Sequence, residues 1–425
     1  MEVYRKEYAE KLDRIDALHP FTNKFVKDDP NLIYLDGNSL GMLPKTTPDE
    51  MSRVINQEWG KGLIRSWNEG WYQRSAQTGA CLAKLIGARP DEVIVADSTS
   101  VNLFKLVYAV LKYQDGRTRI VSDDLNFPSD IYILQGLIEL FGNKHELKLA
   151  QSMDAMTIST EQIKGLLNHQ TALLTLSHVV YKSAFMYDMG QITRMAHENG
   201  AMVIWDLSHA VGAVPVDLNK SGADMAIGCT YKYLNGGPGS IAFLYVRKDL
   251  QEKLQSPIWG WFGQNDPFAF DLQYEPSTGI KRFLAGSPPI LSLSTLEPAL
   301  DIMLEAGMDN IRQKSVRQTD YLVSLAEKYL FPLGFQLSSP RDSRQRGSHI
   351  SLQHPEAYRI CKALIDSETG EKVVIPDFRA PDNIRLGIAP LYNTFAEIFE
   401  AIMQLKQIAE EKLYQHFSLN RDNVT

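Results

Sequence analysis

The sequence has few cysteines, no long hydrophobic run and no excess of basic charge. Its three cysteines, Cys81, Cys229 and Cys361, are far apart and odd in number, so neither a disulfide framework nor a zinc site is expected. No apolar run approaches the length of a membrane span, and the charged N-terminal stretch has no apolar core like that of a signal peptide. We therefore expect a cytoplasmic protein without a metal site or a membrane partner.

The charge balance argues against nucleic acid as a partner. The 425 residues carry a formal net charge of -7 at pH 7, whereas proteins that bind phosphate backbones carry clustered lysine and arginine. With 44% hydrophobic and 22% charged residues, the chain is long enough for a large core and a second domain. A small molecule is the expected partner.

Short apolar runs alternate with longer amphipathic segments, which is typical of an α/β protein with a mostly parallel sheet. Strands are predicted at residues 91–97, 118–124, 172–179, 201–206 and 241–246, and in the apolar run before Tyr231. Helices are predicted at residues 98–113, 128–142 and 188–200. We divide the chain into an N-terminal segment (1–50) associated with a small domain, a large domain (51–300) and a C-terminal small α+β domain (301–425).

Reactive side chains follow two of the predicted strands. Asp206 ends one apolar run and His209 comes three residues later, while Tyr231 and Lys232 follow the next strand in the stretch CTYKYLNGGPGS. Open parallel sheets bind their ligands beyond the carboxyl ends of their strands. We therefore expect a carboxylate, an imidazole and an amine in one crevice.

A hydroxyl-rich helix start adds a phosphate site. Ser98, Thr99 and Ser100 offer hydroxyls and free backbone N–H groups. With a buried lysine and a carboxylate, this set fits pyridoxal phosphate, whose aldehyde needs an amine, whose ring nitrogen needs an acid and whose phosphate needs donors. Each residue alone has a simpler explanation, such as a surface lysine, a turn-forming aspartate or a helix cap, so the prediction rests on their combination.

Seven motifs spread over most of the chain carry a family resemblance. They are YLDGNSLGMLP, STSVNLFK, NFPSD, WDLSHAVG, CTYKYLNGGPG, GWFGQ and IRLGIAPLYNTF. In these motifs the chain resembles the kynureninase family of fold-type I pyridoxal phosphate enzymes. The resemblance implies a large domain with a mostly parallel seven-stranded sheet flanked by helices, a smaller α+β domain, and a homodimer with shared active sites.

The resemblance also implies roles for individual residues. Lys232 would bind the cofactor, Asp206 would pair with its ring nitrogen, and Tyr231 would hold the phosphate and donate a proton. Arg385 would bind the α-carboxylate of an amino-acid substrate, for which a guanidinium is well shaped. The other cofactor-binding positions would be Thr99, Ser100, Phe127, Pro128, Ser129, Asp130, Ser177, His209, Trp261 and Ser287, the last two of these from the neighbouring subunit.

The implied activity is hydrolysis of L-kynurenine to anthranilate and L-alanine by cleavage of the β,γ carbon–carbon bond, in tryptophan catabolism. Ser287 and the tryptophan-rich stretch GLIRSWNEGW resemble bacterial members, which favours kynurenine over 3-hydroxykynurenine as the substrate.

Two alternatives stay open. One is another pyridoxal phosphate enzyme, such as a cysteine desulfurase-like lyase or a group V aminotransferase, for which Cys361 is the candidate nucleophile. The other is a non-catalytic binding protein on the same scaffold.

Overall fold

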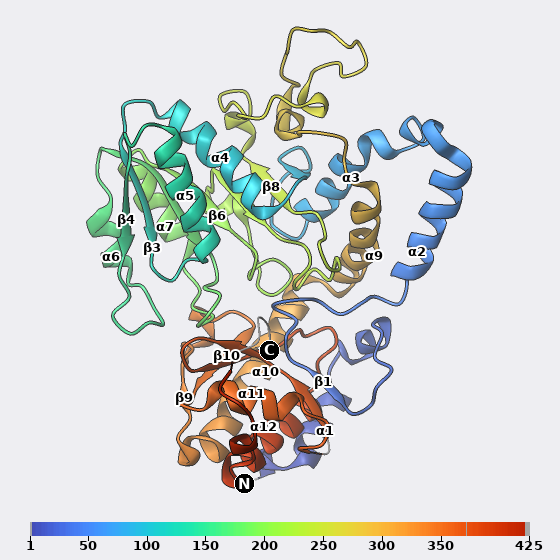
Figure 1. The fold of residues 1–425 in the computed structure, drawn as a ribbon, viewed down its shortest axis with the longest axis vertical. Coiled ribbons are helices and arrows are strands. Elements are labelled where there is room, and N and C mark those ends of the chain that lie inside the picture. The colour runs from blue at the N-terminus through green and yellow to red at the C-terminus, as the bar shows by residue number, and fades with distance from the viewer. Residues whose placement is uncertain (1, 371, 421–425) are drawn as a thin grey trace.

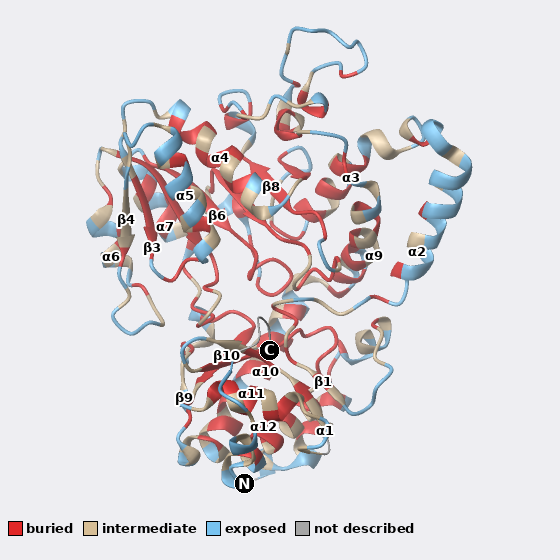
Figure 2. Cartoon of the chain, in the orientation of Figure 1, coloured by how far each residue is buried: buried red, intermediate tan, exposed pale blue. Residues whose placement is uncertain are grey.

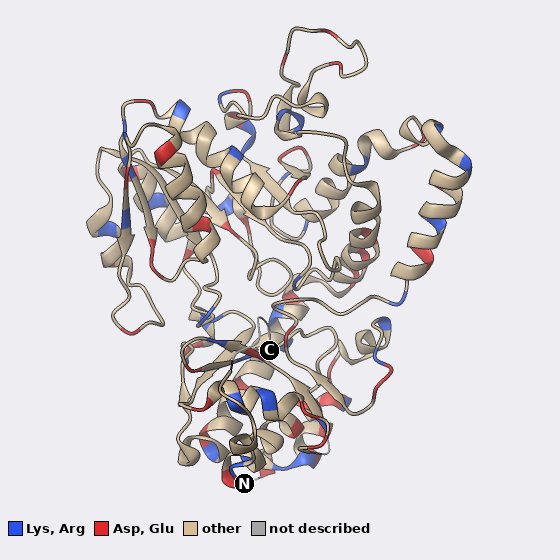
Figure 3. Cartoon of the chain, in the orientation of Figure 1, with Lys and Arg blue, Asp and Glu red and all other residues tan. Residues whose placement is uncertain are grey.

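The computed structural model of the protein describes residues 2–370 and 372–420. Figure 1 shows an upper body built around a larger sheet and a lower body that holds a smaller sheet and the N-terminus. Lysine and arginine are interspersed with aspartate and glutamate over both bodies (Figure 3). Within the described residues, no helix combines the length and the apolar character that crossing a membrane requires.

Seven strands form the larger sheet in the order β2-β8-β7-β6-β5-β3-β4. Strand β8 runs antiparallel to β2 and β7, and the other neighbouring strands pair in parallel. The prediction of a mostly parallel seven-stranded sheet is therefore confirmed. The strands are β2 (Val93–Val95), β3 (Arg119–Asp123), β4 (Glu146–Ala150), β5 (Thr171–Ser177), β6 (Met202–Asp206), β7 (Met225–Gly228) and β8 (Phe243–Val246).

The central strands are buried on both faces of the sheet. Every residue of β5, β6 and β7 is buried, as Figure 2 shows by the red strands between partly exposed helices. Side chains of β6 alternate between the two faces, so Val203 and Trp205 pack in one core cluster and Met202 and Ile204 in another. Continuous burial of this kind explains why the strands read as unbroken apolar runs in the sequence.

Helices cover both faces of this sheet. One face carries α4 (Thr99–Tyr113) and α5 (Pro128–Leu140), which bury Leu106 and Leu134. The other face carries α7 (Met189–Glu198), whose Ile192 lies in the same cluster as Val203 and Trp205. The remaining helices of the upper body are α2 (Thr47–Arg53), α3 (Trp71–Ala83), α6 (Thr160–Leu166), α8 (Leu218–Ser221) and α9 (Ile290–Ala306).

Two segments project from the upper body. A π-helical stretch, Val54–Gly62, follows α2 and forms the arm on the right of Figure 1. Its exposed apolar side chains include Trp59 (56% exposed) and, just beyond it, Ile64 (76%). A second segment, the loop closed by the bridge between Gln264 and Pro276, exposes Phe270 and Leu272.

The lower body contains an antiparallel sheet in the order β12-β13-β10-β9. Its strands are β9 (Gln336–Leu337), β10 (His349–Gln353), β12 (Asp377–Arg379) and β13 (Asn383–Gly387). Apolar side chains of this sheet, of α10 (Met308–Tyr329), of α11 (Ala357–Ile365) and of α12 (Phe395–Glu410) form one core cluster. Residue 300 falls inside α9, which Gly307 separates from α10.

The N-terminal segment binds to the C-terminal part of the chain. Strand β1 (Leu32–Tyr34) pairs in parallel with β11 (Val373–Ile375). Asp13, in α1 (Lys6–Arg14), accepts backbone N–H bonds at the start of α12. This pairing agrees with the assignment of residues 1–50 to the small domain, although the boundaries at residues 50 and 300 stay predictions.

The same segment also reaches a loop of the larger sheet. The backbone N–H of Gly41 donates to the carbonyl oxygen of Tyr231 at 2.8 Å. A Cβ atom at Gly41 would lie 2.3 Å from the carbonyl oxygen of Lys232. Because this contact is with backbone, any larger residue would push the two segments apart.

Candidate functional site

A cavity of about 280 Å³ lies at the carboxyl ends of the central strands. Strands β6 and β7 are neighbours, so the residues that follow them reach the same space, as the sequence predicted. The cavity is lined by Asp97, Ser98, Thr99, Ser100, Phe127, Ser129, Asp130, Asp206, Ser208, His209, Tyr231, Lys232, Gly239, Ser240 and Ala242.

Lys232 projects its amine into this cavity beside His209. The Nζ atom of Lys232 lies 3.2 Å from Nε2 of His209, and 5.7 Å from the ring centre of Phe127. Burial lowers the pKa of His209 well below its usual range, and the charge of Lys232 lowers that pKa further. The imidazole is therefore neutral and can accept a hydrogen bond from the ammonium.

Asp206 is held in place by groups on both sides of its carboxylate. Its Oδ1 atom accepts bonds from the backbone N–H of Ser208 at 2.8 Å and from the Ser208 hydroxyl at 2.6 Å. Its Oδ2 atom lies 3.5 Å from the hydroxyl of Ser177. Burial raises the pKa of Asp206, and the bonds from Ser208 oppose that rise. Ser177 thus lies behind Asp206 and does not line the cavity.

A second buried carboxylate, Asp130, faces the same space. Its side chain is 2% exposed, and its Oδ2 atom has no hydrogen-bond partner among the described residues. Burial, and then the charge of Asp206, raise the pKa of Asp130 well above its usual range. A cationic N–H group placed here would give this oxygen a partner and offset the burial of two carboxylates.

The start of α4 forms one wall of the cavity. Thr99 is the first residue of the helix, and the Ser98 side chain caps it by accepting the N–H of Val101. The N–H groups that lack helical partners at such a start favour an anion. Asp97 also lines the wall, but the fully buried Lys105 donates to its carboxylate at 2.6 Å and neutralises it.

These groups fit the expected cofactor. The amine of Lys232 suits an aldehyde, the unpartnered Asp130 oxygen and Asp206 suit a protonated ring nitrogen, and the helix start suits a phosphate. Phe127 is partly exposed in the cavity, where a flat ring could stack on it.

Arg385 lies beside the cavity, in the middle of β13. It is 1% exposed, and its Nη1 atom donates to the carbonyl oxygen of Tyr181 at 2.7 Å. The ring of Tyr181 packs edge-to-face on Phe127, with 5.2 Å between ring centres. Tyr181 therefore contacts the Arg385 guanidinium through its carbonyl oxygen and the cavity residue Phe127 through its ring.

Three other predicted cofactor residues do not line the cavity. Pro128 is the first residue of α5 and is exposed. Trp261 is 43% exposed, and Ser287 is exposed just before α9. Contact of Trp261 and Ser287 with the cofactor would require a second subunit, and the assignment of all three residues stays a prediction.

The sequence did not identify several lining residues. Ser208 lies between Asp206 and His209 in the motif DLSH, so its place in that motif was a usable signal. Gly239 and Ser240 end the glycine-rich loop that follows Lys232, and neither was assigned to the cofactor site. Asp97 adopts a positive φ of 48°, and nothing in the sequence indicates this conformation.

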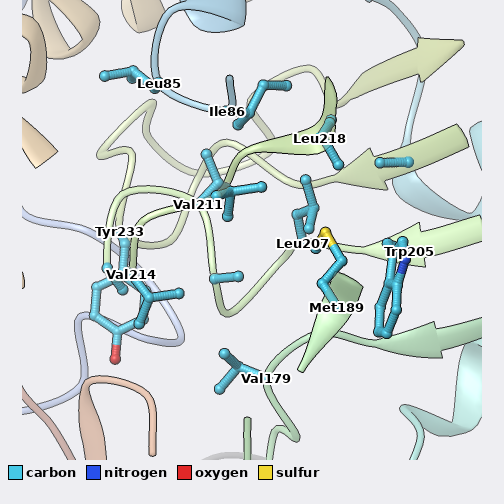
Figure 4. Packing of buried hydrophobic residues seen from close by; sticks show 14 of the residues in the cluster. Leu85, Ile86, Val179, Met189, Trp205, Leu207, Val211, Val214, Leu218 and Tyr233 are labelled. Atoms are coloured by element: carbon cyan, nitrogen blue, oxygen red, sulfur yellow. The ribbon is translucent and has the colours of Figure 1, made fainter. Parts of the chain in front are cut away.

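Tyr233 had no predicted role, and the structure gives it two environments. Its ring packs with Val211 and Val214 in a core cluster, while Figure 4 shows its hydroxyl pointing away from those side chains. Burial raises the pKa of this hydroxyl, and the charges of Arg385 and Asp36 also act on it. Tyr233 therefore connects the loop that carries Lys232 to the surroundings of Arg385.

Cys361 does not have the surroundings of a catalytic thiol. It is fully buried in α11, and burial raises its pKa well above the usual range for cysteine. A nucleophilic cysteine needs a lowered pKa and access to its substrate. In the described part of the chain, no group of three His, Cys, Asp or Glu side chains could hold a metal ion.

Comparison with known proteins gives relatives that match nearly the whole chain. A family model described as the kynureninase C-terminal domain matches residues 311–405. Kynureninase of Pseudomonas fluorescens is 44% identical over 408 residues, which cover 95% of this chain and 95% of that protein. Kynureninase of Burkholderia mallei (strain SAVP1) is 42% identical over 415 residues, which cover 96% of this chain and 97% of that protein.

Solved structures share the fold at low sequence identity. The apo structure of a cysteine desulfurase from Thermococcus onnurineus NA1 has a TM-score of 0.78 and 18% identity, and the match covers 92% of this chain and 96% of that one. A C-DES mutant with glycine covalently linked to its PLP cofactor has a TM-score of 0.76 and 17% identity, with coverage of 89% and 97%. These likenesses confirm the fold-type I prediction and, at such identities, concern the fold alone.

Proposed function

The chain belongs to the kynureninase family, and from this premise we propose that its cavity catalyses hydrolysis of L-kynurenine to anthranilate and L-alanine. Pyridoxal phosphate is the cofactor. The observation that carries the proposal is the meeting of the Lys232 amine, two buried carboxylates and a helix start in one cavity, with Arg385 beside it.

When bound, pyridoxal phosphate supplies an aldehyde that joins an amine and a ring that withdraws electrons from the α-carbon of an attached amino acid. Lys232 would hold the aldehyde in the free enzyme. Asp206, with Asp130 nearby, would keep a proton on the ring nitrogen, because both carboxylates are buried and favour a cationic partner. Thr99 and Ser100 would hold the phosphate with their N–H groups and hydroxyls.

Lys232 and Tyr231 would carry out the proton transfers, and His209 would orient Lys232. The amine of Lys232, freed when substrate takes its place, would move the proton at the substrate's α-carbon. His209 is neutral and lies 3.2 Å from that amine, so it can orient it through a hydrogen bond. Burial raises the pKa of Tyr231, which keeps its hydroxyl protonated and suits it to donate a proton after the carbon–carbon bond breaks.

Arg385 would bind the α-carboxylate of kynurenine. A guanidinium binds a carboxylate with two parallel charge-assisted hydrogen bonds, which fixes the orientation of the substrate as well as its affinity. Arg385 contacts Tyr181, and Tyr181 packs on Phe127, the residue on which a flat ring could stack. Arg385 therefore lies beside that wall of the cavity.

We also propose that the enzyme is a cytoplasmic homodimer with shared active sites. The exposed apolar side chains of Trp59, in the arm, and Ile64, just beyond it, support an interface between subunits. Trp261 and Ser287 would reach the partner's cofactor across it.

The small Ser287 and the tryptophan-rich stretch before α3 favour kynurenine over 3-hydroxykynurenine.

The test is anthranilate release by the purified protein supplied with pyridoxal phosphate. We expect fluorescence of anthranilate on addition of L-kynurenine and a lower kcat/KM for 3-hydroxykynurenine. Lys232→Ala should lose the visible absorption of the lysine-bound cofactor and at least about 10³-fold of the activity. The exposed lysine of α8 gives the matched control Lys220→Ala, which should change neither.

Three results would contradict parts of this proposal. A protein that gains no visible absorption with added pyridoxal phosphate would refute the cofactor site. Release of sulfide from L-cysteine without anthranilate release from kynurenine would favour the desulfurase-like alternative. Equal or higher kcat/KM for 3-hydroxykynurenine would refute the substrate preference alone.

A further inference from the structure

The guanidinium of Arg385 is already occupied within the chain. Its Nη2 atom donates to the hydroxyl of Ser39 at 2.9 Å and forms an ion pair with Oδ2 of Asp377. A guanidinium offers two edges to a carboxylate, Nε with Nη2 and Nη1 with Nη2, and both edges include Nη2. Because Ser39 and Asp377 already lie against Nη2, a substrate carboxylate can bind along either edge only by displacing one of them.

Of the two partners, Asp377 is the one whose displacement keeps the charge balanced. If Ser39 left, two carboxylates would share one buried guanidinium, which is costly at a side chain that is 1% exposed. If Asp377 left, one carboxylate would replace another. A further carboxylate, Asp36, lies 4.0 Å from the same Nη2 atom and makes an added negative charge still less favourable.

Strand register places Asp377 at this position. Asp377 and Arg385 are directly opposite each other in the antiparallel pair β12–β13, so their side chains leave the sheet on the same face. The contact therefore belongs to the sheet itself and does not depend on the conformation of a loop.

Asp377 has a second cation to which it can move. The Nε atom of Arg379 lies 2.9 Å from Oδ2 of Asp377, and residues two apart in a strand share a face. The Arg379 side chain is 34% exposed, so it can follow the carboxylate. Asp377 would thus keep a partner after it leaves Arg385, and no unpaired buried charge would remain.

We propose that Asp377 is a resident competitor of the substrate's α-carboxylate: it occupies Arg385 in the free enzyme and shifts to Arg379 when substrate binds. The inference rests on the proposed function, since it takes Arg385 as the carboxylate anchor. Its consequence is selectivity. A small carboxylate that offers no other contacts cannot displace Asp377. A substrate that also binds the cofactor and packs against Phe127 and Tyr181 can.

Two substitutions should shift substrate binding in opposite directions. Asp377→Asn removes the competitor, so the KM for L-kynurenine should fall about tenfold. Arg379→Gln removes the second ion-pair partner of Asp377, which then stays bound to Arg385. The KM for L-kynurenine should therefore rise about tenfold. Neither change should alter the visible spectrum of the cofactor. Asp377→Glu keeps the carboxylate and should stay closer to the wild-type KM than Asp377→Asn.

The matched control is Asp382→Asn, in the turn between β12 and β13. The Asp382 carboxylate binds Gln353 and Asn383 and does not contact Arg385. The KM of the Asp382→Asn variant should therefore equal that of the wild type. A second readout is the rise in melting temperature with L-alanine, whose carboxylate should bind more tightly to Asp377→Asn than to the wild type. The amine formed by removing the carboxylate of kynurenine should bind all variants alike.

A rise in KM for Asp377→Asn would overturn the inference, because it would mean that Asp377 only orients Arg385. An unchanged or lower KM for Arg379→Gln would overturn it as well, and this variant decides the question if Asp377→Asn fails to fold. Failure of the proposed function looks different, since the wild-type protein would then release no anthranilate at all.

Discussion

Two neighbouring regions of the molecule handle charge in different ways. The cofactor cavity leaves groups free, such as the Asp130 oxygen that has no partner among the described residues. The region around Arg385, which we call the carboxylate corner and define as Asp36, Ser39, Asp377, Arg379 and Arg385, pairs its opposite charges within the chain. The difference teaches that the cavity is prepared to receive a group, whereas the corner must exchange one partner for another.

The largest effect that would sharpen this comparison is expected at Arg385. Arg385→Lys keeps the charge but loses the two parallel bonds to a carboxylate, so kcat/KM for L-kynurenine should fall about 100-fold, which corresponds to roughly 3 kcal/mol of lost charge-assisted hydrogen bonding. The measurement is steady-state anthranilate release, together with cofactor absorption. An altered cofactor spectrum would contradict the separation between corner and cavity.

An effect of similar size concerns the acid–base behaviour of the corner. Burial, and then the charge of Asp377, raise the pKa of Asp36 to about 6. A carboxyl whose pKa is raised on folding binds protons more tightly in the native state, so its contribution to the free energy of unfolding falls as pH rises from about 4 to about 6. The total change should be up to about 3 kcal/mol.

Asp36→Asn should therefore gain stability relative to the wild type as pH rises through that window. Denaturant unfolding of both proteins at pH 4 and pH 7 measures the difference. Burial also raises the pKa of Asp123 to about 6, but this residue is present in both proteins and cancels in the comparison. A difference in stability that does not depend on pH would show that Asp36 is not the titrating group.

The smallest effect is expected in the cavity. Thr99→Ala removes one hydroxyl from the proposed phosphate site, so the affinity for pyridoxal phosphate should fall about tenfold while the KM for kynurenine at saturating cofactor stays unchanged. Thr160 is the first residue of α6, as Thr99 is of α4, and Thr160→Ala is the matched control. A change in KM without a change in cofactor affinity would contradict the assignment of Thr99 to the phosphate site.

The cavity could be predicted from the sequence because its residues follow strands directly. Asp206 ends β6, and Lys232 follows β7 by four residues. Parallel strands that are adjacent in sequence and in the sheet bring such residues together without further information. The helix start at Thr99 could also be predicted, because a run of hydroxyl residues precedes an amphipathic segment there.

The corner could not be predicted in the same way. Asp377 and Arg385 are partners because of the register of two short antiparallel strands. Pro381 and Asp382 indicate a turn between these strands but do not by themselves set the register. Ser39 joins them from the N-terminal segment, hundreds of residues away. Strand β4 was also missed, because this edge strand is only partly buried and lacks a clear apolar run.

The contact between Gly41 and the backbone of Tyr231 and Lys232 has a consequence for synthesis of the protein. The segment that carries Gly41 is anchored through β1, whose partner β11 lies near the other end of the chain. A nascent chain leaves the ribosome N-terminus first, so β1 must wait for β11 while the larger sheet folds. The lysine loop therefore gains its N-terminal support only after β11 has left the ribosome, and a chain that ends before β11 would carry that loop unsupported.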